Sequence, residues 1–348
     1  MKNKIKYLFV IITPFQKLVI DQLFGEKLKL EESLVLLNDI VVNDDILCNK
    51  ETIINYEFSR KKLFKEPFTY LKRTKQNVRK VKSNIQLVNK KFQFSKNLEI
   101  YLGTDKDIYT QLLLNDLYKH SNEYRLTLVD EGLGYYVNLN FKDRMLSLMY
   151  KLLTPIIFGS RLYYIKRLGV YPKINNIYLR TPELLNSKNK DINYVKFNLK
   201  NKTNTFTNIK EGKVLLYSFP NQDGTISSEA KIKIIQDIGR YLATLDKDLI
   251  IKPHPRENIY ELKTVLGKQK NVRILDNKFT GEDINYFEFE LIINFFSSIV
   301  IDILDKNYPK NKILTIGFNK KPQIHFSKNL KYCYIKKFKA SHFINFDQ

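Results

Sequence analysis

Short apolar runs alternate with helical segments over almost the whole of this 348-residue chain. The runs cover residues 6–12, 33–37, 39–42, 98–102, 125–129, 213–219, 249–251, 272–275, 291–295 and 313–316. Helical patterns separate several of them, for example at 17–24, 104–118, 226–245 and 258–266. Strands that alternate with helices form parallel sheets covered on both faces, so the sequence predicts an α/β fold.

A polar stretch divides this pattern into two blocks. From about residue 181 to 211 the composition shifts to Asn, Lys and Thr with weak periodicity, and the strand pattern then restarts. A chain of this length is expected to form about two domains. We therefore expect an amino-terminal domain over 1–185, a linker over 186–211 and a carboxy-terminal domain over 212–348. A cleft between two such domains is a common place for a ligand.

The chain is strongly basic, with a formal net charge of +23, which favours polyanionic partners without choosing among them. Basic residues concentrate over 60–82, interleaved with aromatic and Leu residues, which indicates a basic amphipathic surface segment or simply a solvated face. The apolar run 146–158 is interrupted by Lys151 and Pro155, so it predicts a buried or interfacial helix and not a membrane-spanning helix. Any membrane contact is therefore expected to be peripheral, on the cytoplasmic face.

The chain contains two cysteines, Cys48 and Cys333, which cannot make a disulfide framework. This cysteine content fits the reducing cytosol.

A histidine between two prolines follows one of the predicted strands. Pro253 and Pro255 prevent the 249–251 strand from continuing, so His254 is expected at its carboxyl end, where open α/β sheets bind ligands. Lys252 and Arg256 beside it favour an anion such as a phosphate. The alternative interpretation is a turn stiffened by proline, with a histidine on the surface.

Two carboxylates follow the 125–129 strand directly. Asp130 and Glu131 precede Gly132 and Gly134, which allow a sharp turn and a close approach of the backbone. Carboxylates at that edge are candidates for a general base, provided that they reach the hydroxyl they deprotonate. An acidic turn without chemistry is the alternative.

Hydroxyl groups stand at two further strand-to-helix junctions. Ser297 and Ser298 lie between the 291–295 strand and a helical segment at 299–304, where they suit either a phosphate or an ordinary helix cap. Thr13 is expected to cap the first helix with Pro14 at its first position. The free amides there would hold an anion or a sugar hydroxyl.

Several sites are absent from the sequence. It contains no phosphate-binding loop of the Gly-x-x-x-x-Gly-Lys type, no complete Gly-x-Gly-x-x-Gly and no Gly-x-Ser-x-Gly elbow. His120, His325 and His342 have no partner at metal-ligand spacing, so no metal and no cofactor are expected.

Taken in order, four motifs resemble those of the bacterial sialyltransferases: Thr13-Pro14-Phe15-Gln16, Asp130-Glu131-Gly132, His254-Pro255 and Ser297-Ser298. The first motif and the length are most similar to glycosyltransferase family 52, the lipooligosaccharide and capsule sialyltransferases. Family 80 and the polysialyltransferases share the three later motifs. The resemblance implies an α/β fold of the GT-B class, with two Rossmann-like domains facing across a cleft and CMP held by the carboxy-terminal one.

The resemblance also implies roles for individual residues. Asp130 would be the general base on the acceptor hydroxyl, with Glu131 as its neighbour or substitute. His254 would bond or protonate the leaving phosphate. Donor contacts would come from Thr13, Gln16, Gly132, Lys252, Pro255, Ser297 and Ser298.

The implied reaction is a metal-independent, inverting transfer of sialic acid from CMP-sialic acid to a galactose-like hydroxyl of a surface glycan. The acceptor would be lipid-linked or free, and no specific nucleic acid is expected as a partner. Two rivals stay open at this stage. One is a GT-B transferase that uses another nucleotide sugar, and the other is a non-catalytic protein that binds polyanions through its positive charge.

Overall fold

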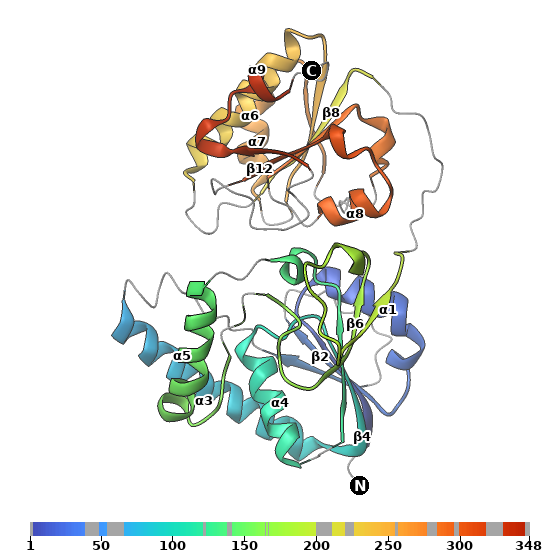
Figure 1. Ribbon diagram of the computed structural model, residues 1–348, viewed down its shortest axis with the longest axis vertical. Coiled ribbons are helices and arrows are strands. Elements are labelled where there is room, and N and C mark those ends of the chain that lie inside the picture. Colours follow the sequence, from blue (N-terminus) through green and yellow to red (C-terminus); the bar gives the residue numbers. More distant parts are fainter. Residues whose placement is uncertain are drawn as a thin grey trace. The chain divides into compact units, whose positions relative to one another are not determined.

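The computed structural model describes residues 3–38, 49–53, 66–120, 123–137, 141–163, 165, 167–199, 211–219, 226–254, 257–276, 284–295, 299–317 and 330–344. The chain divides into two compact units, Met1–Leu199 and Lys200–Gln348, and each is built around its own sheet (Figure 1). The predicted α/β class is confirmed.

The first unit contains a seven-stranded sheet in the order β3-β2-β1-β4-β5-β6-β7, with parallel pairing throughout. Its strands are β1 (Asn3–Ile11), β2 (Ser33–Asn38), β3 (Lys50–Ile53), β4 (Phe92–Leu102), β5 (Arg125–Val129), β6 (Ile174–Leu179) and β7 (Asn193–Lys196). Its helices are α1 (Pro14–Leu28), α3 (Pro67–Lys91), α4 (Ile108–His120) and α5 (Phe141–Phe158), with short 3-10 turns η1 (Leu133–Tyr136) and η2 (Pro182–Leu184).

The second unit contains a six-stranded parallel sheet in the order β10-β9-β8-β11-β12-β13. Its strands are β8 (Lys213–Tyr217), β9 (Asp248–Lys252), β10 (Val272–Ile274), β11 (Leu291–Asn294), β12 (Ile313–Gly317) and β13 (Lys331–Tyr334). Its helices are α6 (Ser228–Ala243), α7 (Ile259–Leu266), α8 (Ile299–Asp305) and α9 (Ala340–Phe343), with 3-10 turns η4 (Tyr286–Glu288), η5 (Lys310–Lys312) and η7 (Ile335–Lys337). One core cluster, which includes Val214, Ile235 and Ile293, joins this sheet to its helices.

Both sheets reverse their strand order once. In the first unit the reversal falls between β1 and β4, and in the second between β8 and β11, which is the doubly wound Rossmann arrangement. Ligands of such sheets bind outside the carboxyl ends of the strands at the reversal. The fold therefore places Thr13, after β1, and Asp130, after β5, at the ligand-binding edge of the first sheet.

The predicted linker needs a correction. Strand β7 lies inside the 186–211 stretch and pairs in parallel with β6, while Phe197 and Leu199 are buried in the core of the first unit. The first unit thus continues to Leu199. Composition concealed this strand because its side chains are half-buried or exposed, so it lacks the apolar run of a central strand.

Two further predicted segments lie wholly or partly outside the described residues. The strand expected at 39–42 and the first residues of the basic segment, 60–65, lie outside them, whereas 67–82 is helical as part of α3. Residues 146–158 are helical as predicted, and the helix begins earlier, at Phe141. Among the helices that the structure describes, none combines the length and the apolar character needed to cross a membrane.

Candidate active site

The acidic turn after β5 is built around Asp130. Its Oδ1 accepts a hydrogen bond from the Gly132 amide at 2.6 Å, and its Oδ2 accepts from the Nε of Arg180 at 2.8 Å and from the Arg180 amide at 3.3 Å. Gly132 has φ +93°, in a region that favours glycine, so the sharp turn depends on this residue. The carboxylate thereby joins the end of β5 to the end of β6.

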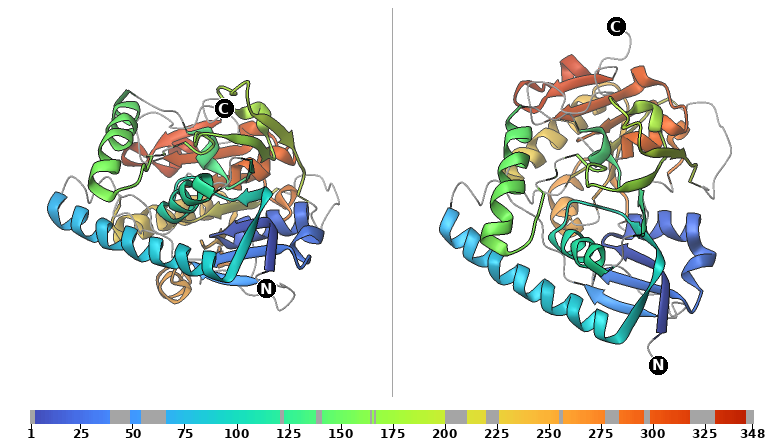
Figure 2. Two further views of the ribbon diagram at one scale, coloured as in Figure 1. Left: turned by 90° about the horizontal axis from the view of Figure 1, so that it is seen from below. Right: turned by 60° about the horizontal axis from the view of Figure 1, so that its bottom comes forward.

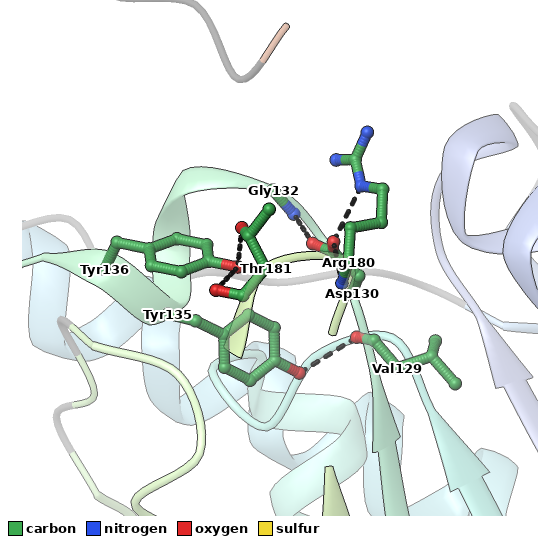
Figure 3. A network of polar contacts seen from close by, with 7 residues as sticks. All are labelled: Val129, Asp130, Gly132, Tyr135, Tyr136, Arg180 and Thr181. Atoms are coloured by element: carbon green, nitrogen blue, oxygen red, sulfur yellow. Dashed lines mark hydrogen bonds and ion pairs between the residues drawn. The ribbon is translucent and has the colours of Figure 1, made fainter. Parts of the chain in front are cut away.

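Asp130 and Arg180 form a buried ion pair, with side chains 0% and 1% exposed. Figure 3 shows the Nε edge of the guanidinium facing Asp130, while its two terminal nitrogens point away from the carboxylate. The guanidinium carbon lies 4.9 Å from the ring centre of Phe15, at cation-π distance. The Thr-Pro-Phe-Gln motif and the acidic motif therefore meet through Arg180.

Two tyrosines, Tyr135 and Tyr136, hydrogen-bond to residues beside the acidic turn. The hydroxyl of Tyr135 donates to the Val129 carbonyl at 2.9 Å, and that of Tyr136 lies 3.0 Å from Oγ1 of Thr181 (Figure 3). Burial raises the pKa of both phenols, and nearby carboxylates raise it further: Asp105 and Glu131 ahead of Asp130 for Tyr135, and Asp130 for Tyr136. Both phenols are therefore neutral donors at physiological pH.

Glu131 differs from Asp130 in its exposure. It is half-buried and Asp130 has no exposed surface, although the two are adjacent in the chain. A base must come within hydrogen-bond reach of the hydroxyl it deprotonates, which the burial of Asp130 opposes. Glu131 is therefore the more accessible of the two carboxylates.

The Thr13 cap forms as predicted. Thr13 Oγ1 accepts from the Gln16 amide at 3.2 Å, and Gln16 Oε1 accepts in return from the amides of Ile12 and Thr13, at 2.7 and 3.3 Å. Gln16 is fully buried, and a Cβ on Gly103, after β4, would come within 1.9 Å of its Cδ. In this arrangement Gln16 serves the cap, and half-buried Thr13 remains the candidate for a donor contact.

In the second unit, a buried carboxylate holds the histidine turn. Glu257 Oε2 accepts from the His254 amide at 2.6 Å, and Oε1 accepts from Lys231 Nζ at 2.6 Å and from Ser218 Oγ at 2.8 Å. Side chains of Glu257 and Lys231 are 3% and 8% exposed. This clamp ties the ends of β8 and β9 to α6 and leaves the imidazole half-buried.

The chain leaves the second sheet where the prolines predict, because β9 ends at Lys252. Lys252 itself is buried, and its Nζ donates to the Pro253 carbonyl at 2.8 Å, so in this arrangement it stiffens the turn. Pro255, Arg256, Ser297 and Ser298 lie outside the described residues. Over the part of the chain that the structure describes, no group of three or more His, Cys, Asp or Glu side chains is arranged to hold a metal ion.

Sequence reasoning missed the residues that organise both turns. Arg180 and Lys231 stand 50 and 26 positions from the carboxylates that they bind. Arg180 directly follows β6, so its position at the end of a strand could have identified it as a candidate site residue. Nothing in the local sequence of α6 distinguishes Lys231 from other lysines.

Solved structures resemble this chain in fold. The glycotransferase of kitacinnamycin matches with a TM-score of 0.56 and 8% identity, over 98% of this chain and 89% of that one. S. aureus MnaA in complex with UDP matches with a TM-score of 0.49 and 12% identity, over 92% of this chain and 80% of that one. No curated relative matches the chain by sequence.

Two doubly wound parallel units with candidate residues at the strand ends, in a chain similar in fold to a solved glycotransferase, define the GT-B fold class. The family model for alpha-2,8-polysialyltransferase (POLYST) matches residues 8–304, which include all four motifs. The chain therefore belongs to the alpha-2,8-polysialyltransferase family. This confirms the resemblance to the bacterial sialyltransferases through their polysialyltransferase relatives. It makes the chain a glycosyltransferase and sets aside the non-catalytic polyanion-binding protein.

Proposed function

We propose that this glycosyltransferase moves sialic acid from CMP-sialic acid to a glycan acceptor, with inversion at the anomeric carbon and without a metal ion. The match of the polysialyltransferase model over 8–304 carries this proposal, because it encloses both the acidic turn and the histidine turn. The name of the matched family favours the 8-hydroxyl of another sialic acid as the acceptor over the galactose-like hydroxyl expected first.

The reaction exchanges one bond at the anomeric carbon for another. A carboxylate takes the proton of the acceptor hydroxyl, whose oxygen forms a bond to the anomeric carbon of sialic acid. The bond from that carbon to the CMP phosphate breaks, and its electron pair leaves on the phosphate. Catalysis therefore requires a base for the acceptor and groups that stabilise the leaving charge.

We assign the base to Glu131 and a positioning role to Asp130. The Asp130 carboxylate is already engaged with the Gly132 amide and with Arg180, and it fixes the turn that carries Glu131. The half-buried position of Glu131 gives a hydroxyl access to its carboxylate. Full activity in Glu131→Gln, together with lost activity in a folded Asp130→Asn protein, would instead assign the base to Asp130, the first choice from the sequence.

We assign stabilisation of the leaving phosphate to His254. It follows β9 beside the strand reversal of the second sheet, where phosphates of nucleotide ligands bind in doubly wound folds. The buried Glu257 carboxylate fixes its backbone, so little ordering is needed when the donor binds. Ser297 and Ser298 are proposed as further phosphate contacts on the sequence pattern alone.

Calorimetry with free nucleotides tests the choice of donor. The proposal predicts that CMP binds and that UDP and GDP bind at least about tenfold more weakly, and His254→Ala should lower the affinity for CMP. Tight binding of UDP without binding of CMP would support the rival GT-B transferase that uses another sugar. Addition of EDTA should leave turnover unchanged, and an activity that EDTA abolishes and Mg²⁺ restores would contradict metal independence.

We also propose peripheral association with the cytoplasmic face of the membrane, where a lipid-linked surface glycan is built. The basic part of α3 within the predicted 60–82 segment supports this, since each Lys or Arg near an anionic surface contributes about 1 kcal/mol.

A further inference from the structure

Helix α5 carries a row of exposed apolar side chains along one face. Its side chains are large and between 44% and 82% exposed: Phe141, Met145, Leu148, Met149, Leu152, Leu153 and Ile156. Their spacing of three, four and seven residues places them along one side of the helix. The opposite side is buried through Leu146, Tyr150, Thr154 and Phe158. We call the exposed side the α5 apolar face.

Seven exposed apolar side chains on one helix differ from the scattered ones that any surface shows. Elsewhere in the described residues, exposed large hydrophobics such as Leu30, Val170 and Tyr260 are spread over different elements. Contiguous apolar surface on a protein marks a site of contact with a partner or a membrane. The α5 apolar face therefore indicates a contact site.

A basic helix, α3, contacts the carboxyl end of α5. Helix α3 contains eight Lys and Arg residues and no acidic residue, and its exposed basic residues include Lys72, Arg73, Lys75, Arg79 and Lys80. Its other side is anchored in the core by Val78, Val81, Ile85 and Val88.

The two helices are joined by Lys82 of α3, whose Nζ donates to the carbonyls of Phe158 and Gly159 at 3.0 and 3.3 Å. Both views of Figure 2 show α5 (green) beside α3 (blue). The carboxyl end of α5 is thus fixed against the middle of α3, and the apolar and cationic surfaces belong to one region of the first unit.

The charge of this region decides among possible occupants. A second copy of the chain would bring another α3 of the same sign and a further net charge of +23, so like charges oppose self-association here. A nucleic acid would satisfy the cations and leave the apolar residues in water. An anionic lipid surface satisfies both, because apolar side chains enter the acyl boundary while Lys and Arg meet the headgroups.

We propose that the α5 apolar face and the exposed cations of α3 together dock the protein onto an anionic lipid membrane. This inference rests on the proposed peripheral association and identifies the surface that produces it. The apolar face supplies insertion, which a charged surface alone does not.

Flotation with lipid vesicles tests the proposal on the full chain. Wild type should bind phosphatidylcholine vesicles that contain phosphatidylglycerol and bind poorly to phosphatidylcholine alone. Ile156→Glu, at a side chain 82% exposed, should weaken binding about tenfold or more, since it places a charge among the inserted residues. The matched control is Tyr260→Glu on α7, at a side chain 83% exposed, which should bind like wild type.

Neutralising the cations tests the second half of the surface. Each of Lys72→Gln, Lys75→Gln and Arg79→Gln should weaken binding about fivefold at low salt and less at high salt. Binding by Ile156→Glu equal to that of wild type would overturn the proposal. So would a wild-type dimer that Ile156→Glu converts to a monomer, since the face would then be a contact between copies.

A transfer assay with a water-soluble acceptor separates this inference from the proposed function. Ile156→Glu should transfer sialic acid to that acceptor at the wild-type rate while it loses vesicle binding. An absence of transfer by wild type with intact vesicle binding would refute the proposed donor and leave the docking surface standing.

Discussion

Replacing Asp130 with Asn should destabilise the first unit, because it breaks a buried ion pair. The change removes the negative charge beside an Arg180 side chain that is 1% exposed, and it turns one accepting oxygen into an amide that faces N–H donors. Removing one partner of a buried pair typically costs about 3–5 kcal/mol. We expect the free energy of unfolding of the first unit to fall by about that amount.

Urea unfolding followed by circular dichroism measures the loss. The transition of the first unit is identified by a core variant of that unit, Leu128→Ala, whose side chain is fully buried. The control is the exposed pair of Lys196 and Glu183 at 3.2 Å in the same unit, where Glu183→Gln should cost less than about 1 kcal/mol.

A double-mutant cycle separates the pair from the fold around it. Asp130→Asn combined with Arg180→Met removes both charges, so the double variant should be more stable than additivity predicts by about 2 kcal/mol or more. An Asp130→Asn protein that unfolds like wild type, with a coupling energy near zero, would refute the positioning role of Asp130.

Three further changes follow from the same contacts. Glu257→Gln should lower the affinity for CMP about tenfold in calorimetry and destabilise the second unit, because it removes the charge that holds the His254 turn. Burial raises the pKa of Asp105 to about 6 from its ordinary value of 3.8, so the folded state binds the proton more tightly than the unfolded state. The Asp105 carboxyl therefore stabilises the folded state below about pH 4, and this stabilisation of about 3 kcal/mol is lost as the pH rises to about 6. Asp105→Asn should remove that part of the pH profile of unfolding. Gly103→Ala should cost about 1–3 kcal/mol in thermal unfolding, because its Cβ would overlap the buried glutamine of the α1 cap.

Controls and contrary outcomes are available for each change. Glu261→Gln, at an exposed position on α7, should leave CMP affinity as it is, and an equal loss in both variants would contradict the clamp. Gly25→Ala meets no atom within 4 Å and lies inside α1, so it should not destabilise the protein. A pH profile of Asp105→Asn that parallels that of wild type would remove Asp105 as the titrating group.

The order of strands and helices was predictable because a parallel sheet buried on both faces requires apolar runs. Strands such as β5 and β9 were predicted from their apolar runs, and the prolines around His254 marked where β9 ends. Strand β7 at the edge of its sheet was missed, since all of its side chains are half-buried or exposed and none forms a buried apolar run. The positions of these apolar runs also placed the candidate residues Asp130 and His254 after the ends of strands.

The partners of those residues could not be predicted, because they come from distant segments. Arg180 reaches Asp130 only once β6 lies beside β5, and Lys231 reaches Glu257 only once α6 packs on the second sheet. Burial is a property of the assembled fold, so the difference in exposure between Asp130 and Glu131 was also invisible in the sequence.

The most direct test of this account is a transfer assay with CMP-sialic acid and an oligosialic acid acceptor, followed by linkage analysis of the product. We predict release of CMP and growth of the acceptor through new α-2,8 linkages. Glu131→Gln should lower turnover by about 10²-fold or more while CMP still binds, the usual scale for losing a general base. Turnover of a UDP-linked sugar in place of CMP-sialic acid would contradict the proposed function, and full activity in Glu131→Gln together with its loss in a folded Asp130→Asn would assign the base to Asp130.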